Sequence, residues 1–213
     1  LWLNSGGYIV LNGQSGSSIR GLLPFLSRWR FHYALTIPVE SSHGLRPQNV
    51  LRLFTQENFG DNASEVYFKL NYYEKNESPT RNASNGMFLI SRYLDSDNLY
   101  YGGIRVDGAA VIKKKKDGKY VTLDYKPVIR GDYDRDKNPN LISPNDWLGV
   151  RLSIRNVAKG VELILSLDRE GRGTWKETLR LIDREEPLTG AGRSGFRTDF
   201  MDVEFKNFEV VNQ

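Results

Sequence analysis

Aromatic and planar polar side chains alternate with apolar residues along several segments, and these residue types are well suited to bind a sugar. Sugars pack their C–H faces on aromatic rings and bond their hydroxyl groups to planar polar groups. The candidates on the predicted outward positions of three segments are Arg52, Gln56, Glu65, Tyr67, Lys69, Tyr101 and Arg105. Because adjacent strands lie about 4.8 Å apart, we expect Tyr67, Lys69 and Tyr101 to converge on neighbouring strands. The arginines favour an acidic sugar, since a guanidinium pairs with a carboxylate through two hydrogen bonds. The alternative is an ordinary solvated sheet face.

Catalysis on the same face is an open alternative. Glycoside hydrolysis usually needs two carboxylates about 5–9 Å apart, and Glu65 is the only carboxylate in this set. A polysaccharide lyase needs a cation for the uronate, plus an acid and a base that tyrosine can supply. Arg52 and Tyr101 provide those types.

A second group of candidates is a set of alternating carboxylates, Asp132, Asp134 and Asp136. Calcium binds six to eight oxygen ligands, and this spacing in a loop can supply several of them. Lys137 replaces the glycine expected after the third carboxylate, and Ser143 replaces the closing glutamate. The segment therefore predicts either a calcium site or a charged, solvated loop.

Three N-glycosylation sequons begin at Asn62, Asn76 and Asn82. Their clustering in Asn- and Ser-rich sequence is typical of a glycosylated exterior. Together with a first residue, Leu1, that is not methionine, they predict an extracellular or cell-surface location. Secretion without glycosylation would fit the same location.

Alternation of apolar and polar residues predicts strands through most of the chain. The expected strands are Phe31–Pro38, Asn49–Gln56, Ser64–Tyr72, Met87–Tyr93, Leu99–Val106, Ala110–Lys115, Tyr120–Leu123, Leu148–Arg155, Val161–Asp168, Trp175–Ile182 and Val203–Val210. Asp-Gly pairs at 107–108 and 117–118 predict hairpins. Only Gly21–Arg30 and Ile182–Glu186 are candidates for short helices. The prediction is an all-β, two-sheet antiparallel β-sandwich, a jelly roll, with Leu163 and Leu165 in its core.

Composition limits the classes of protein. With 213 residues, 39% hydrophobic and 26% charged, the chain fits a single globular domain over residues 1–213. No apolar run reaches the roughly 20 residues of a membrane span, and the net charge of +4 gives no reason to expect nucleic acid. The run Lys113–Lys116 is interpreted as protection of an edge strand. No cysteine is present for a disulfide or a thiolate site.

Three segments resemble a known family. Asn98–Gly108 followed by Val111–Lys115 is similar to the central hairpin of concanavalin A-like (laminin G-like) jelly rolls, and Gly195–Phe208 is similar to their closing strand. Leu165–Asp168 followed by Trp175 resembles the strand and tryptophan between them. The resemblance implies a concave sheet that holds a glycan, and it makes calcium an expected cofactor. The superfamily includes lectins, binding modules, hydrolases and lyases, so the fold alone does not select a function.

The leading hypothesis is extracellular binding of a poly- or oligosaccharide through the concave sheet. The second is a polysaccharide lyase or glycoside hydrolase on that face. The third is a structural subunit of a surface layer or extracellular filament, which would self-associate.

Overall fold

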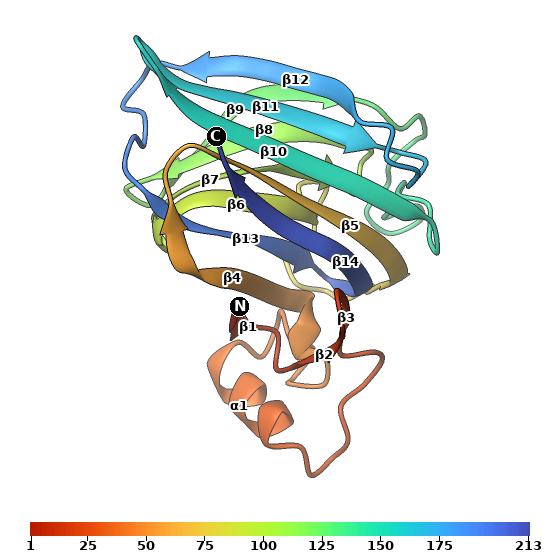
Figure 1. Ribbon diagram of the computed structural model, residues 1–213. Coiled ribbons are helices and arrows are strands. Elements are labelled where there is room, and N and C mark those ends of the chain that lie inside the picture. Colours follow the sequence, from red (N-terminus) through yellow and green to blue (C-terminus); the bar gives the residue numbers. More distant parts are fainter.

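The computed structural model describes residues 1–213 and consists of two facing seven-stranded sheets, with a small helical lobe beyond one lateral edge of the sandwich (Figure 1). The first sheet has the order β1 (Trp2–Ser5), β4 (Val50–Phe59), β13 (Gly192–Asp199), β6 (Gly86–Asp95), β7 (Asn98–Arg105), β8 (Ala109–Lys116) and β9 (Lys119–Pro127). The second has the order β12 (Lys176–Asp183), β11 (Gly160–Asp168), β10 (Trp147–Val157), β5 (Asn62–Tyr73), β14 (Met201–Asn212), β3 (Ser15–Ser18) and β2 (Ile9–Asn12). The predicted all-β sandwich is confirmed.

The core lies between the two sheets and follows the predicted alternation. Leu163 and Leu165 on β11 are fully buried, as expected, and they belong with Leu53 and Ile104 to one cluster of 27 buried residues from both sheets. Both predicted Asp-Gly hairpins form, joining β7 to β8 and β8 to β9. In the second, Asp117 and Gly118 have φ values of 48° and 80°, the left-handed conformations that a tight two-residue turn requires.

The prediction of a strand at Phe31–Pro38 is wrong. It forms α1 (Arg28–Thr36), and the short helix η1 (Pro47–Asn49) follows it. Tyr33 is the one buried side chain of α1, so alternation in this segment reflected no buried sheet face. The helix candidates are wrong as well, because Ser27 precedes the first turn of α1 and β12 extends to Asp183.

The lysine run does not protect an edge. β8 lies inside the sheet, and β9 forms the edge beyond it. Lys114 points between the sheets, where its ammonium bonds to both oxygens of Asp183 at 3.1 and 2.8 Å. The Tyr100 hydroxyl donates to the same carboxylate and accepts a hydrogen bond from the amide of Leu188. This interior ion pair therefore links β8 to β12 across the sandwich.

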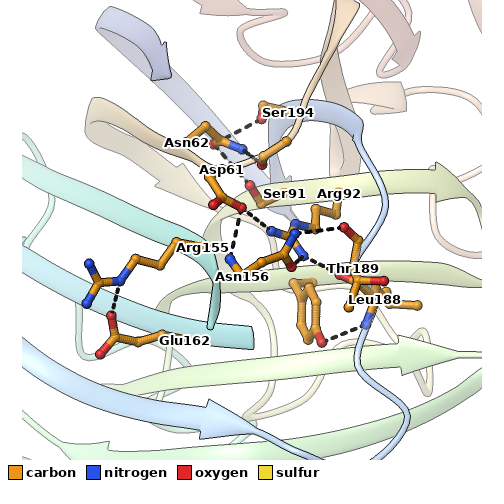
Figure 2. Close-up of polar contacts among 12 residues, drawn as sticks. Asp61, Asn62, Ser91, Arg92, Arg155, Asn156, Glu162, Leu188, Thr189 and Ser194 are labelled. Carbon is orange, nitrogen blue, oxygen red and sulfur yellow. Dashed lines mark hydrogen bonds and ion pairs between the residues drawn. The ribbon is translucent and has the colours of Figure 1, made fainter. Parts of the chain in front are cut away.

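A second polar cluster closes the end of the sandwich at the turn between β4 and β5 (Figure 2). Arg92 has a φ of 50°, lies where the β6–β7 register shifts, and is fully buried. Its guanidinium donates to Asp61 Oδ1 at 2.9 Å, Asn156 Oδ1 at 2.8 Å and the carbonyl of Leu188 at 2.6 Å. Arg92, on β6 of the first sheet, is thus bonded to the turn between β4 and β5, to β10 and to the segment between β12 and β13.

The structure excludes one predicted glycosylation site. Asn62 is fully buried, and its Oδ1 accepts from the hydroxyls of Ser91 and Ser194 (Figure 2). Its Nδ2, the atom that would carry a glycan, donates to the carbonyl of Gly60. At the half-buried Asn76, Nδ2 donates to the backbone of the 39–40 segment, whereas Asn82 is exposed. Asn82 is therefore the most accessible of the three.

No helix in the chain combines the length and the apolar character needed to cross a lipid bilayer.

Leu165→Ala tests the core. Leu165 is fully buried mid-strand, so its truncation should lower the free energy of unfolding by about 2–5 kcal/mol in chemical denaturation. Val211→Ala, at an exposed residue, should change it by less than about 0.5 kcal/mol. Similar values for the two variants would contradict the assigned strand faces.

Arg92→Gln tests the polar closure. Removing the buried charge leaves Asp61 and the Leu188 carbonyl without their partner, and we expect a loss of about 3 kcal/mol. The neighbouring Arg155, which pairs with Glu162 through a side chain that is more than half exposed, is the matched control. Arg155→Gln should cost less than about 1 kcal/mol in the same measurement.

Candidate functional site

A second aromatic cluster covers the outer face of the first sheet. It consists of Phe54, Phe88, Ile90, Leu99, Tyr101 and Val111, all buried although they point away from the core. The Tyr101 ring packs edge-on against Phe88, with centroids 5.5 Å apart, and against Tyr120 at 6.3 Å. Tyr120, on the edge strand β9, remains 55% exposed. The cluster is therefore a rigid apolar floor with one accessible ring.

A groove of about 660 Å³ lies over this floor. Its sheet residues come from β4, β13, β7, β8 and β9, and its walls come from the segment between α1 and β4 and from the loop between β5 and β6. The charged and aromatic side chains along it are Glu40, Arg52, Tyr101, Lys113, Tyr120, Arg197, Asp199 and Phe200. Strands distant in the sequence thus bring one set of polar and aromatic groups together.

Two cations in the groove have no partner in the chain. Lys114, Lys115 and Lys116 each form an ion pair, whereas Lys113 forms none and lies with its ammonium 6.0 Å from the Tyr101 ring. Arg52, on β4, also makes no ion pair or side-chain hydrogen bond. The groove therefore presents two positive charges that form no ion pair within the protein.

The third cation of the groove is held in place. Arg197 donates to both oxygens of Asp199 at 2.9 Å, and its guanidinium lies 5.3 Å from the Tyr101 ring. Its Nε and the Oδ1 of the fully buried Asn49, which also lines the groove, have no hydrogen-bond partner in the protein. Both atoms are themselves buried.

The groove perturbs its own titratable groups. Burial, with repulsion from Arg105 and Arg197, lowers the pKa of the Lys113 ammonium below its usual range. Burial raises the pKa of the Tyr101 hydroxyl well above its usual range, although Arg197 opposes the shift. Tyr101 therefore stays protonated at neutral pH and is a poor proton acceptor.

Of the predicted site residues, Arg52 and Tyr101 line this groove. Arg105 lies on the same sheet but is engaged elsewhere, because it donates to Asp107 at 2.7 Å and to the carbonyl of Ala83 at 3.0 Å. Gln56 is exposed and four residues beyond Arg52 along β4, a separation of about 13 Å. The groove thus contains two of the seven residues predicted from the sequence.

Glu65, Tyr67 and Lys69 do not converge with Tyr101. They lie on β5 in the second sheet, whereas Tyr101 lies on β7 in the first. Because both sets point away from the shared core, they occupy opposite outer faces of the sandwich. The expectation of neighbouring strands is therefore wrong, although each residue faces outward as predicted.

On the second sheet these side chains have local partners. Arg151 Nε donates to Glu65 at 2.7 Å, Lys69 pairs with Glu204 at 3.0 Å, and the Tyr67 hydroxyl donates to Asp168 at 3.0 Å. Burial, together with the bond to Asp168, raises the pKa of Tyr67 to about 12. The carboxylates of Glu65, Asp168 and Glu204 are thus engaged by neighbouring side chains.

The loop containing Asp132, Asp134 and Asp136 does not assemble a calcium site. No group of three or more Asp, Glu or His side chains in the chain is arranged to hold a metal ion. Asp134 Oδ1 instead accepts the amides of Asp136 and Lys137 at 2.9 and 2.7 Å, and Asp136 pairs with Arg81 at 3.5 Å. Asp134 thus caps a turn and Asp136 is ion-paired, so the three carboxylates are not gathered as a donor set for calcium.

Sequence reasoning missed Lys113, Tyr120, Arg197 and Asp199 as groove residues. Alternation did contain part of the signal, because Lys113 follows the inward Ile112 and Arg197 follows the inward Phe196. The rest of the signal is the order of the strands in the sheet, which depends on the pairing of β13 with β6 and of β6 with β7.

No protein-family model matches the sequence, and no curated protein matches it either. Among solved structures, the chain is similar to the carbohydrate-binding module CBM66 from Bacillus subtilis, with a TM-score of 0.58 and 10% identity over 98% of this chain and 94% of that one. It is also similar to the exoplasmic/lumenal domain of VIP36 in its Ca²⁺/Man3GlcNAc-bound form, with a TM-score of 0.52 and 11% identity over 99% of this chain and 85% of that one. The chain has the concanavalin A-like jelly-roll fold that its hairpin and closing-strand motifs predict.

Proposed function

We propose that the chain binds an extracellular carbohydrate in the groove of the first sheet, and that the preferred ligand is an oligosaccharide carrying carboxylate groups. The observation that carries the proposal is a groove lined by two cations without an ion pair, Arg52 and Lys113, with the exposed Tyr120 ring 5.9 Å from the Lys113 ammonium. A ring offers a stacking surface to the sugar, and the cations offer charge-assisted hydrogen bonds to its acid groups. The similarity in fold to a carbohydrate-binding module and to a sugar-bound lectin domain supports the class of ligand.

The charge arrangement favours an acidic ligand over a neutral one. An unpaired, partly desolvated cation is costly, and that cost is offset when an anion binds beside it. Three cations and two carboxylates line the groove, and one carboxylate, Asp199, is already bound to Arg197. A uronic acid placed over Tyr101 would supply the missing negative charge.

The geometry favours binding over turnover. The bond between Asp199 and Arg197 leaves Glu40 as the one uncommitted carboxylate along the groove, whereas hydrolysis usually needs two. A lyase base drawn from Tyr101 would have to ionise against the burial that raises the pKa of this hydroxyl. The extracellular location rests on the carbohydrate ligand class and on the accessible sequon at Asn82, beside the groove.

Arg52→Ala tests the ligand class. For an oligogalacturonate the variant should bind at least about 10-fold more weakly by isothermal titration, because a charge-assisted pair is lost. For the same oligomer with its carboxyl groups reduced, affinity should change less than about 3-fold. Tyr120→Ala should weaken both ligands, since stacking does not depend on ligand charge.

Arg172→Ala, at a side chain that is largely exposed and outside the groove, is the matched control and should leave both affinities unchanged. Equal losses for the acidic and the reduced oligomers in Arg52→Ala would contradict the acidic preference. Release of unsaturated or reducing ends during the titration would contradict a purely binding function.

The lowered pKa of Lys113 predicts a pH dependence. Affinity for the acidic oligomer should fall as pH rises through this pKa, at a lower pH than for an ordinary lysine. The folded chain also releases this proton before the unfolded chain does, so the charged form of Lys113 opposes folding and stability should rise with pH between the two pKa values.

Lys113→Gln separates these effects. The variant should keep or raise the melting temperature, because it removes repulsion from Arg105 and Arg197, and it should bind the acidic oligomer more weakly without the alkaline fall in affinity. A lower melting temperature would show that Lys113 is a structural residue. Lys115→Gln, which removes the ion pair with Asp97 on the neighbouring hairpin, is the matched control and should retain the pH profile.

A further inference from the structure

The lobe between β3 and β4, residues 19–49, exposes large apolar side chains that the fold leaves uncovered. Phe25 is 75% exposed and Leu26 is 92% exposed in the loop before α1, and Phe31 and Leu35 on the helix are 72% and 80% exposed. Leu22 is also mostly exposed. Soluble proteins rarely gather such residues on one projecting segment without a partner.

The exposed residues of α1 share one face. Arg28, Phe31, His32 and Leu35 have the spacing i, i+3, i+4 and i+7, which aligns them along one side of the helix. Tyr33, on another side, is the buried anchor. The helix thus turns an apolar pair outward, with Arg28 and His32 on the same face.

The lobe is firmly attached to the sandwich. The Tyr33 hydroxyl accepts the amides of Gly6 at 2.7 Å and Gly7 at 3.1 Å. Gly44, with a φ of 77°, lies so close to α1 that a Cβ there would be 2.0 Å from the carbonyl of Arg30. The amide of Leu23 donates to the carbonyl of Leu45 at 2.8 Å. These contacts hold the helix in one position, so the exposed face is a fixed feature of the fold.

The charge of this region is one-sided. No acidic residue occurs from Leu1 to Val39, a stretch that contains Arg28 and Arg30 as well as Arg20, which pairs with Glu204 at 2.7 Å. The Arg30 guanidinium lies 4.9 Å from the Phe25 ring, and that of Arg28 lies 4.9 Å from the Trp29 ring. The apolar side chains and the positive charges are therefore interleaved on the same surface, next to two aromatic rings.

We propose that this lobe docks on a membrane surface that carries anionic lipids. Leucine and aromatic side chains enter the boundary between headgroups and acyl chains, while arginines bind the headgroups, and affinity rises with both contributions. Because Leu26 has almost no protein contact, it protrudes as an inserting side chain does. A second copy would bring Arg28 and Arg30 against like charges, so it fits this surface less well.

The lobe lies at the lateral edge of the sandwich where β1, β2 and β3 lie, and it leads into the start of β4 (Figure 1). The segment that follows α1 supplies Ile37 and Glu40 to the wall of the groove. Docking through Leu26 and Phe31 therefore places the groove beside the headgroup layer, where surface glycans lie.

Vesicle co-sedimentation tests the proposal without any glycan, so its result is independent of the groove. The chain should pellet with vesicles of phosphatidylcholine containing about a third phosphatidylserine, and far less with phosphatidylcholine alone. Leu26→Glu and Phe31→Glu should each reduce the bound fraction at least about 10-fold. Arg28→Gln should reduce binding about 5-fold, and added salt should do the same for the parent chain.

Leu94→Glu is the matched control, because Leu94 is a half-exposed leucine near the far end of β6. This variant should pellet like the parent, and unchanged melting temperatures in all variants would show that they fold. Equal loss in Leu94→Glu, or no binding of the parent to either vesicle, would overturn the proposal. A dimer in light scattering that Leu26→Glu dissociates, without vesicle binding, would also overturn it and assign the face to a second copy.

Discussion

The apolar core shared by the two sheets is the constraint on which the other surfaces depend. Each strand must present one set of alternating residues to that core, so the remaining set faces outward whatever its chemistry. On β7 this places Tyr100 inward and Tyr101 outward, and on β8 it places Lys114 inward and Lys113 outward. A shift of one residue would exchange every pair. The groove is therefore positioned by packing on the opposite side of the sheet.

The charged groups inside the sandwich obey a different rule. Removing an ion from water costs several kcal/mol unless its partners are complete. Lys114 donates to Asp183 and to the carbonyl of Glu185, and Arg92 donates to three acceptors from separate segments of the chain. These buried groups fix how the segment from β12 to β13 crosses the end of the sandwich, a task that apolar contacts, which have no direction, perform poorly.

The sequence contained the local part of this structure and lacked the pairing. Alternation identified the strands from β4 to β12, together with β14, and the outward residues on them, because burial of one face leaves a period of two. It could not show that Tyr67 and Tyr101 lie on opposite sheets, since strand order is set by contacts between distant segments. The same limitation produced the error at Phe31–Pro38, where alternation had no strand partner and a helix anchored by Tyr33 formed. Arg52 and Tyr101 were predictable as outward residues; the absence of an ion pair at Arg52 and Lys113 was not.

The two outer faces of the sandwich provide an internal comparison for that absence. On the second sheet Arg151 has Glu65 and Lys69 has Glu204, whereas Lys206, 4.2 Å from the Trp147 ring, forms no ion pair. Acidic residues are thus available in the chain, and its 26 carboxylates nearly balance its 30 cations. Neutralising the first sheet in the same way would have required one carboxylate opposite Lys113 on β7 or β9, where Tyr101 and Thr122 stand. Because such a substitution would relieve the repulsion around Lys113, the charge left in the groove works against the stability of the empty protein. Residues that oppose stability in this way are characteristic of sites that are completed by a ligand.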